Sequence, residues 1–197
     1  MRDHLDPTQH REWGRSRRKA CPRTIQSFWE MTDARDPVEI LQRQEEHRLP
    51  FLVPVRHARM LTSPFAFYRG SAAVMSADLA TTPSTGIQAQ LCGDAHLSNF
   101  GLFGSPERAL VFDCNDFDET HPGPWEWDVK RLAVSAVLMA ADRGWDTDAQ
   151  RRLARAVGFG YRVSMADFAS KGRLAVWYSK VTDEQLLALA KDDNRAA

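Results

Sequence analysis

The stretch LCGDAHLSNFGLF, residues 91–103, joins two apolar segments through a loop that holds an Asp, a His and an Asn. Asp94 and Asn99 are five positions apart in this loop. Catalytic loops of phosphotransferases use this spacing, with the Asp accepting the proton of a substrate hydroxyl and the Asn holding a magnesium ion. Asp94 is therefore a candidate catalytic base. An ordinary loop can have the same composition, so the neighbouring sequence has to distinguish the two interpretations.

The segments on either side of this loop have the pattern of β-strands. Residues 87–91 alternate apolar and polar side chains, as a half-buried strand does. Residues 100–103 are apolar, the turn sequence GSPER follows, and residues 109–119 form a second strand that ends in carboxylates. We expect an α+β fold in which a small antiparallel hairpin over residues 87–118 carries the acidic site, with no helix between its arms.

The acids at the end of the second strand suit a divalent cation. Asp116 and Asp118 would face the same side of an extended strand. Carboxylates on one face repel one another unless a cation lies among them. Magnesium prefers oxygen ligands, commonly one or two carboxylates with phosphate oxygens and water. Candidate metal ligands are thus Asn99, Asp116, Asp118 and Asp113, and the alternative is that these acids cap turns and the next helix.

Residues outside this acidic set are further candidates. His96 could act as a base, bind a metal or make a structural hydrogen bond. Asp128 lies at the start of a predicted helix, where it either orients the loop through backbone N–H groups or only caps the helix. Arg56, Arg59 and Arg69 suit bidentate phosphate binding, or at least two of them pair with the acids. We take His96 and Asp128 as candidate catalytic residues and Arg69 as the candidate cofactor-binding residue.

The helical segments are predicted from apolar periodicity and capping residues. Asp36 and Pro37 begin one helix, and Pro50 and Pro54 break the segment that follows it. A short helix is expected at GSAAVMSADLA. Longer helices are expected over residues 126–143, 147–170 and 182–191.

Composition and charge restrict the class of protein. The chain has 197 residues, enough for one domain, and its 26 basic and 26 acidic residues cancel. Residues 1–24 carry a net charge of +4 and residues 91–130 a net charge of −6. The acidic segment suits a cation site, and a solvated acidic surface is the alternative. Residues 1–23 are basic and aperiodic, so we expect a flexible tail ahead of a domain over residues 24–197, without nucleic-acid binding.

Cysteine usage and hydropathy bear on the compartment. The three cysteines are odd in number and lack metal-ligand spacing, which favours a reducing compartment. The beginning of the chain has no apolar core of a signal peptide, and no apolar run approaches the roughly 20 residues of a membrane helix. We expect a cytoplasmic protein without a membrane partner.

The segment GDAHLSNFG, followed by NDFDET and PWEWDVKRLA, resembles the pattern of aminoglycoside phosphotransferases, choline kinases and homoserine kinases. On this resemblance Asp94 matches the catalytic base, Asn99 and Asp116 match magnesium ligands, and Asp128 matches a buried Asp on the following helix. Asp113 is a competing match for the metal-binding Asp. The resemblance implies part of the C-lobe of a protein-kinase-like fold, Mg²⁺ and ATP as cofactors, and an unknown hydroxyl as phosphate acceptor.

A longer resemblance includes RDPVEIL, LVPVRHARM, SPFAFYRGSAAVMSADLA and PGPWEWDVKRLAVS. With the loop motif, these segments resemble the bacterial family "domain of unknown function 2252" from about residue 10 to 180. The resemblance implies that the chain corresponds to an N-terminal portion of longer relatives. A kinase also needs a glycine-rich loop and a Lys on the phosphates, and no GxGxxG precedes residue 94. We therefore expect a nucleotide lobe in a later region of longer relatives, and an incomplete or inactive site in this chain alone.

Two other functions compete with a phosphotransferase. GDAH also resembles the GDxH element of calcineurin-type metal-dependent phosphoesterases, although the further DxH and GNH elements of that class are missing. The third hypothesis is a non-catalytic interaction protein in which the acids are structural.

Overall fold

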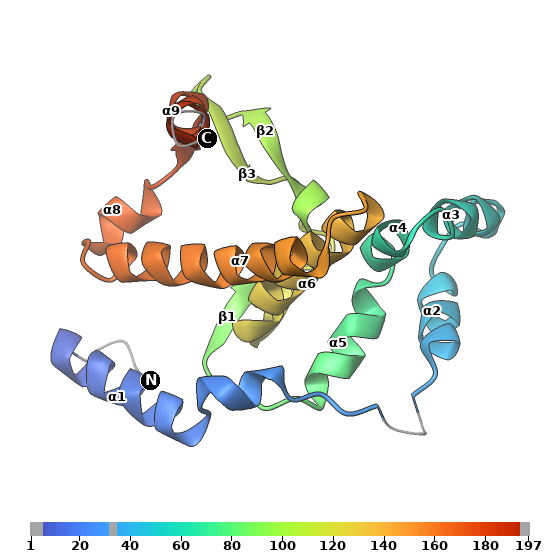
Figure 1. Cartoon of the computed structure of the whole chain (residues 1–197), viewed down its shortest axis with the longest axis horizontal. Coiled ribbons are helices and arrows are strands. Elements are labelled where there is room, and N and C mark those ends of the chain that lie inside the picture. The colour runs from blue at the N-terminus through green and yellow to red at the C-terminus, as the bar shows by residue number, and fades with distance from the viewer. Residues whose placement is uncertain (1–5, 32–34, 194–197) are drawn as a thin grey trace.

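The computed structural model describes residues 6–31 and 35–193 and has a mixed α+β fold (Figure 1). The helices are α1 (Pro7–Ala20), α2 (Pro37–Glu45), α3 (Val53–Met60), α4 (Pro64–Arg69), α5 (Ala72–Ala80), α6 (Glu126–Asp142), α7 (Thr147–Phe168), α8 (Arg173–Trp177) and α9 (Asp183–Asp193). The strands are β1 (Gln88–Leu91), β2 (Phe100–Gly104), β3 (Leu110–Cys114), β4 (His121–Pro124) and β5 (Val181–Thr182). Short 3-10 helices span Arg23–Ser27, Pro50–Leu52 and Leu97–Asn99. Within the described residues, no helix is long and apolar enough to cross a membrane.

Helix α6 lies at the centre of the fold, with α7 packed along it and α4 and α5 against it (Figure 1). Small side chains allow this close packing, since Ala136 and Ala140 on α6 are almost fully buried. The turn between α6 and α7 uses Gly144 at a φ of 74°, and Asp146 then caps α7 by accepting from the backbone N–H of Ala149. The predicted helices over 126–143, 147–170 and 182–191 are confirmed as α6, α7 and α9.

The strands form two small antiparallel sheets instead of the single hairpin that we expected. β1 pairs with β4, with Leu91 opposite His121, while β2, β3 and β5 form a separate three-stranded sheet. The acidic strand ends at Cys114, so Asp116 and Asp118 lie beyond it. Their placement depends on a turn, because the backbone N–H of Asp118 donates to Oδ1 of Asp116 at 3.0 Å. The expected absence of a helix between residues 105 and 119 is confirmed.

Prolines begin helices in the segment where we expected them to break one. Pro50 begins the 3-10 helix Pro50–Leu52 and Pro54 stands in the first turn of α3, while Pro64, beyond that segment, stands in the first turn of α4. The first turn needs no N–H from proline, and the fixed φ of proline is already helical. Ser63 caps α4 by accepting from the backbone N–H of Ala66 at 3.1 Å.

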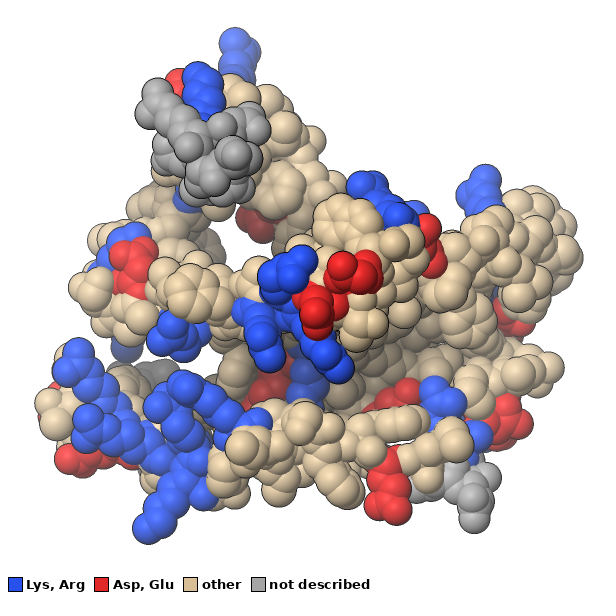
Figure 2. All heavy atoms as spheres, in the orientation of Figure 1, with Lys and Arg blue, Asp and Glu red and all other residues tan. Residues whose placement is uncertain are grey.

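Residues 7–20, expected to be an aperiodic tail, form helix α1 instead. Asp6 and Gln9 make a reciprocal capping box, and Pro7 occupies the first turn. Basic side chains in the last turn suit the negative end of the helix dipole. Figure 2 shows the Lys and Arg side chains that gather over α1.

Helices α2, α3 and α5 share a small apolar core made of Leu41, Met60 and Val74, with Ile40 packed against it. The turn after α4 also contacts this core. A Cβ on Gly70 would lie 2.6 Å from the Met60 side chain, so a larger residue there would displace that side chain. This core holds α2, α3 and α4 as one wall beside the loop of residues 92–99.

Candidate functional site

Helix α6 holds the loop of residues 92–99 through polar side chains on one face. Asp128 accepts hydrogen bonds from the backbone N–H groups of Cys92 at 2.7 Å and Gly93 at 3.1 Å. The predicted backbone contact of Asp128 is thus present, although the residue is half-buried and not fully buried. Ser135, which is fully buried, accepts from the backbone N–H of Leu97 at 3.1 Å. Positions three and seven residues apart lie on one face of a helix, which explains why these contacts share it.

Between these two anchors, Arg131 pairs with Asp94. Its Nε and Nη2 atoms lie 2.6 and 2.5 Å from Oδ1 of Asp94, and Arg131 is only 3% exposed. Nη2 also donates to the backbone oxygen of Tyr68 at 2.9 Å, and the guanidinium lies 4.4 Å from the Tyr68 ring centre. Burial raises the pKa of Tyr68. The negative charge of Asp94 is therefore compensated by a cation fixed in the interior.

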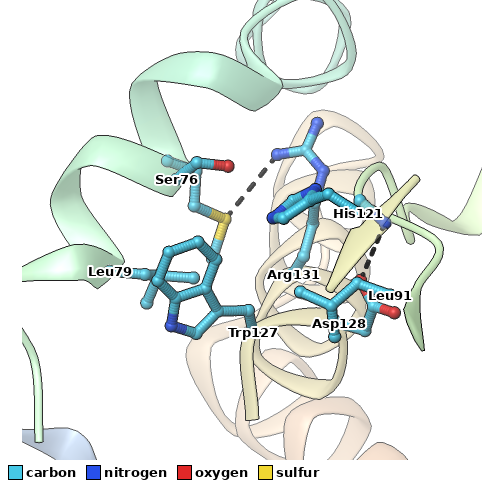
Figure 3. Close-up of a pocket in the computed structure, with 9 residues that line it drawn as sticks. Ser76, Leu79, Leu91, His121, Trp127, Asp128 and Arg131 are labelled. Carbon is cyan, nitrogen blue, oxygen red and sulfur yellow. Dashed lines mark hydrogen bonds between the residues drawn. The ribbon is translucent and has the colours of Figure 1, made fainter. Parts of the chain in front are cut away.

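Figure 3 shows Asp128 and Arg131 projecting from α6 on one side of Trp127, with His121 and Leu91 beside them. The gap that these side chains line measures only about 10 Å³. A cavity of that size holds at most a water molecule. This part of the structure is consequently packing beneath the loop, and no ligand site.

Gly93 is required by the path of the loop. Its φ is 82°, a conformation that side-chain-bearing residues rarely adopt. A Cβ at this position would lie 1.9 Å from the backbone oxygen of Glu119. The glycine thereby lets the loop pass directly against the segment that carries Asp116 and Asp118.

Asn99 connects the loop to the acidic segment. Its Nδ2 donates to the backbone oxygens of Asp94 at 3.1 Å and Asp116 at 3.0 Å, and Asn99 is buried. Both partners are carbonyl oxygens, which only accept hydrogen bonds. The atom of the Asn99 side chain that faces them must therefore be the amide nitrogen, and Oδ1 is on the other side. The backbone of the two segments is joined again where the N–H of Asn115 donates to the backbone oxygen of Asn99 at 2.9 Å.

Two free thiols lie beneath the same junction. The sulfur atoms of Cys92 and Cys114 are 3.1 Å apart, and the Cys114 thiol lies 3.4 Å from the backbone oxygen of Asp116. Burial, with a contribution from the Cys114 hydrogen bond, raises the pKa of Cys92 to about 12. Cys92 is thus a neutral thiol at physiological pH and a weak nucleophile.

His96 is buried beside Asp94. Its Nε2 lies 3.5 Å from Oδ2 of Asp94, its ring packs edge-on against Phe65, and its Nδ1 has no partner among the described residues. Burial lowers the pKa of His96, and the charges of Arg131 and Arg69 lower it further, against the opposing effect of Asp94. The ring is therefore neutral at pH 7.

An open cleft of about 850 Å³ lies between the wall of α2–α4 and the loop. Asp94, His96 and Asp116 line one side of it, and an adjoining hollow adds Asp118 and Glu119. The structure thus brings the candidate base and two of the candidate metal ligands to one cavity. Asp113 does not line it, because Asp113 is exposed on β3, where its carboxylate accepts the N–H of Cys114 at 2.8 Å.

The opposite side of the cleft is basic. Arg48, Arg56, Arg59 and Arg69 line it together with His47. We expected that at least two of Arg56, Arg59 and Arg69 could pair with the acids of the loop and strand end, but Asp94 pairs with Arg131 instead.

Among the described residues, the basic side chains of this wall fall into two groups. Arg56 is partly buried and bonded to Glu45, Gln44 and the backbone oxygen of Gly70. Burial lowers the pKa of Arg56, and the neighbouring charge of Arg48 lowers it further. By contrast, the exposed guanidinium groups of Arg48, Arg59 and Arg69 have no hydrogen bond or ion pair with another described residue.

The anchoring residues of α6 other than Asp128 were not among the site residues predicted from the sequence. Arg131 and Ser135 follow Asp128 by three and seven positions in a largely apolar helix. Polar residues repeated at helical spacing within an apolar face indicate a buried polar contact, and that signal was available in DVKRLAVS. Arg48 was also missed, since it lies outside any motif.

The acidic side of the cleft offers carboxylate oxygens as donor atoms. No group of three or more His, Cys, Asp or Glu side chains within residues 6–31 and 35–193 could hold a metal ion. Oxygen donors from one amide and one or two carboxylates are the set that magnesium uses when phosphate oxygens and water complete its octahedron. Asp116 and Asp118 line the hollow, whereas Asn99 is buried, lines neither cavity and has its Nδ2 bonded to two backbone oxygens.

The site, an Asp–Asn loop fixed on a helix and joined to an acidic turn, faces a basic wall across a cleft and belongs to a mixed α+β protein. Residues 48–197 match the family described as "Uncharacterized protein conserved in bacteria (DUF2252)", and the chain belongs to that family. The match begins after α1 and α2 and covers the loop, the acidic turn and α6. No curated protein and no solved structure matches the chain.

Proposed function

We propose that this chain carries the base and the magnesium-binding half of a phosphotransferase-like site, which transfers a phosphoryl group from ATP to a hydroxyl of an unidentified acceptor. The observation that carries the proposal is the Asn99 side chain, which bonds the backbone of Asp94 to that of Asp116 beside a common cleft. This order of strand, Asp–Asn loop, hairpin, acidic turn and anchoring helix is similar to the pattern of small-molecule kinases. The protein-kinase-like fold is part of the proposal.

The roles follow from the contacts of each side chain. Oδ1 of Asp94 is occupied by Arg131, which leaves Oδ2 to accept the proton of an acceptor hydroxyl. Asn99 and Asp116 would hold Mg²⁺, with Asp118 beside them. Mg²⁺ supplies neutralisation of the charge on the transferring phosphoryl group. Asp128 is a positioning residue, because it reaches the loop only through backbone N–H groups.

His96 is a weaker candidate for the base than Asp94, since burial lowers its pKa and its buried ring packs against Phe65 beside Asp94. It instead supports the Asp94 carboxylate from one side. The phosphoesterase alternative requires a larger set of metal-binding side chains, and we do not propose it.

The test compares two aspartates of the same segment. ATP binding to the whole chain is measured by calorimetry with and without Mg²⁺, for the wild type, Asp116→Asn and Asp113→Asn. We expect Mg²⁺ to strengthen ATP binding about tenfold or more in the wild type and in Asp113→Asn, but not in Asp116→Asn. Equal behaviour of the two variants, or no effect of Mg²⁺ in the wild type, would refute the proposal.

A further inference from the structure

The cleft has two sides of opposite charge that do not pair with each other. Asp94, Asp116 and Asp118 line one side, and the unpaired Arg48 and Arg69 line the other in the same hollow. Opposite charges this close to one another usually form ion pairs when their side chains can reach. In the described residues they do not, so the space between them separates the two charged sets. A ligand that is anionic toward the arginines and carries a cation toward the acids would satisfy both sides.

The three exposed arginines come from one wall of the cleft, which the bonds of Arg56 tie together. Arg56 is fixed by Glu45 and the backbone of Gly70, which ties the end of α2 to α3 and to the turn after α4. Arg48 follows α2, Arg59 lies on α3 and Arg69 ends α4, so each free guanidinium comes from a different element of one wall. Free arginines from several elements facing one cavity are suited to an anion with several acceptor oxygens.

We infer that Arg48, Arg59 and Arg69 form an anion-binding wall that recognises a chain of at least two phosphate groups, with Arg56 as the residue that positions the wall. The inference deepens the proposed function and rests on it for the identity of the cation. The chain lacks a glycine-rich loop before residue 94, and the arginine wall takes over the recognition of phosphate that such a loop performs.

An apolar ledge adjoins the wall. Leu49, Leu52 and Val55 line the same cleft with roughly half of their surfaces exposed, at 57%, 47% and 46%. A ligand with its phosphates on the arginines can place an uncharged group on this ledge. The phosphates can belong to a nucleotide or to a phosphorylated acceptor, and a comparison of probes distinguishes these sources.

The test measures binding of inorganic tripolyphosphate to the whole chain by calorimetry, without Mg²⁺ and at fixed low ionic strength, because salt screens exposed charges. We expect Arg48→Gln, Arg59→Gln and Arg69→Gln each to weaken binding about tenfold. Arg152→Gln is the matched control, since Arg152 is exposed on α7 outside the cleft, and its affinity should stay within about twofold of the wild type. Circular dichroism verifies that each variant is folded.

ATP is the second probe. Tighter binding of ATP than of tripolyphosphate, reduced by Leu52→Gln, would support a nucleotide on the ledge. Equal or weaker binding of ATP would support a phosphorylated acceptor on the same wall. No binding of tripolyphosphate, or wall variants that behave like Arg152→Gln, would overturn the inference.

The proposed metal site and the proposed arginine wall can be refuted independently of each other. If the wall variants lose tripolyphosphate while Asp116→Asn keeps the full effect of Mg²⁺, the arginine wall stands and the proposed metal site is wrong. If Asp116→Asn removes the effect of Mg²⁺ while the wall variants bind like the control, the metal site stands and the arginine wall is wrong.

Discussion

The arginines on the two sides of the cleft differ in burial and in their contacts. Arg131 beneath the loop is 3% exposed, and its guanidinium contacts the Asp94 carboxylate and the backbone of Tyr68. Arg48, Arg59 and Arg69 across the cleft are exposed and unpaired among the described residues. A buried cation with all of its contacts inside the protein fixes geometry, whereas exposed cations without partners are free to meet a ligand. The difference indicates a rigid loop that faces a wall left open for binding.

The largest expected effect comes from Arg131→Met, which would leave the Asp94 carboxylate facing an apolar side chain. Breaking a buried pair by removing one partner typically costs about 3–5 kcal/mol of the free energy of unfolding. Urea denaturation of the variant would measure this loss. Arg131→Lys is the control, since it keeps the charge and should lose less. A loss as small as that of Arg152→Gln would mean that the pair does not hold the loop.

Asp128→Ala should have the next largest effect, because it removes the acceptor of the Cys92 and Gly93 N–H groups. Leaving buried donors unpaired costs about 1–3 kcal/mol of stability. Asp128→Asn keeps one acceptor oxygen and should cost less. If Asp128→Ala lost stability without any weakening of Mg²⁺-dependent ATP binding, Asp128 would not position the loop for ligands.

The smallest expected effect is on the pH dependence of stability. The pKa of His96 is lowered in the folded state, so the unfolded chain binds more protons once the pH falls below the ordinary value of 6.5. The stability due to the neutral ring is complete above that pH and declines as the pH falls toward the folded pKa. The decline has a slope of at most about 1.4 kcal/mol per pH unit.

Thermal unfolding between pH 7.5 and pH 5 would detect this decline. His96→Gln should flatten the pH profile in that window. The exposed His10 offers the control, and His10→Gln should leave the profile unchanged. A profile that is equally steep in His96→Gln would show that another group is responsible.

Local sequence signals predicted the elements that depend on local physics. Apolar periodicity and capping residues were sufficient for α6, α7 and α9, and the Asp–Asn spacing pointed to a loop that the fold does place at a cleft. The contact of Asp128 with the loop backbone is one of the two roles that its position at a helix start suggested.

The remaining features depend on contacts between distant segments. β1 pairs with β4 across the whole hairpin, and sequence alternation does not specify a partner strand. Arg131 and Asp94 are 37 positions apart in the sequence, so no local pattern predicts that they pair. The spacing of Asp6 and Gln9 fits a capping box and could have predicted the start of α1. The many basic residues of this segment favoured a flexible tail instead.

One measurement tests both sides of the cleft at once. Exchange of the arginine Nε–H protons with water, followed by nuclear magnetic resonance with and without tripolyphosphate, reports whether each guanidinium has a partner. We predict slow exchange for Arg131 in both states, because its Nε donates to Asp94 at 2.6 Å, and fast exchange for Arg48, Arg59 and Arg69 that slows only with the anion. Fast exchange of Arg131 without the anion, or no slowing of the other three, would contradict the division between a fixed loop and a binding wall.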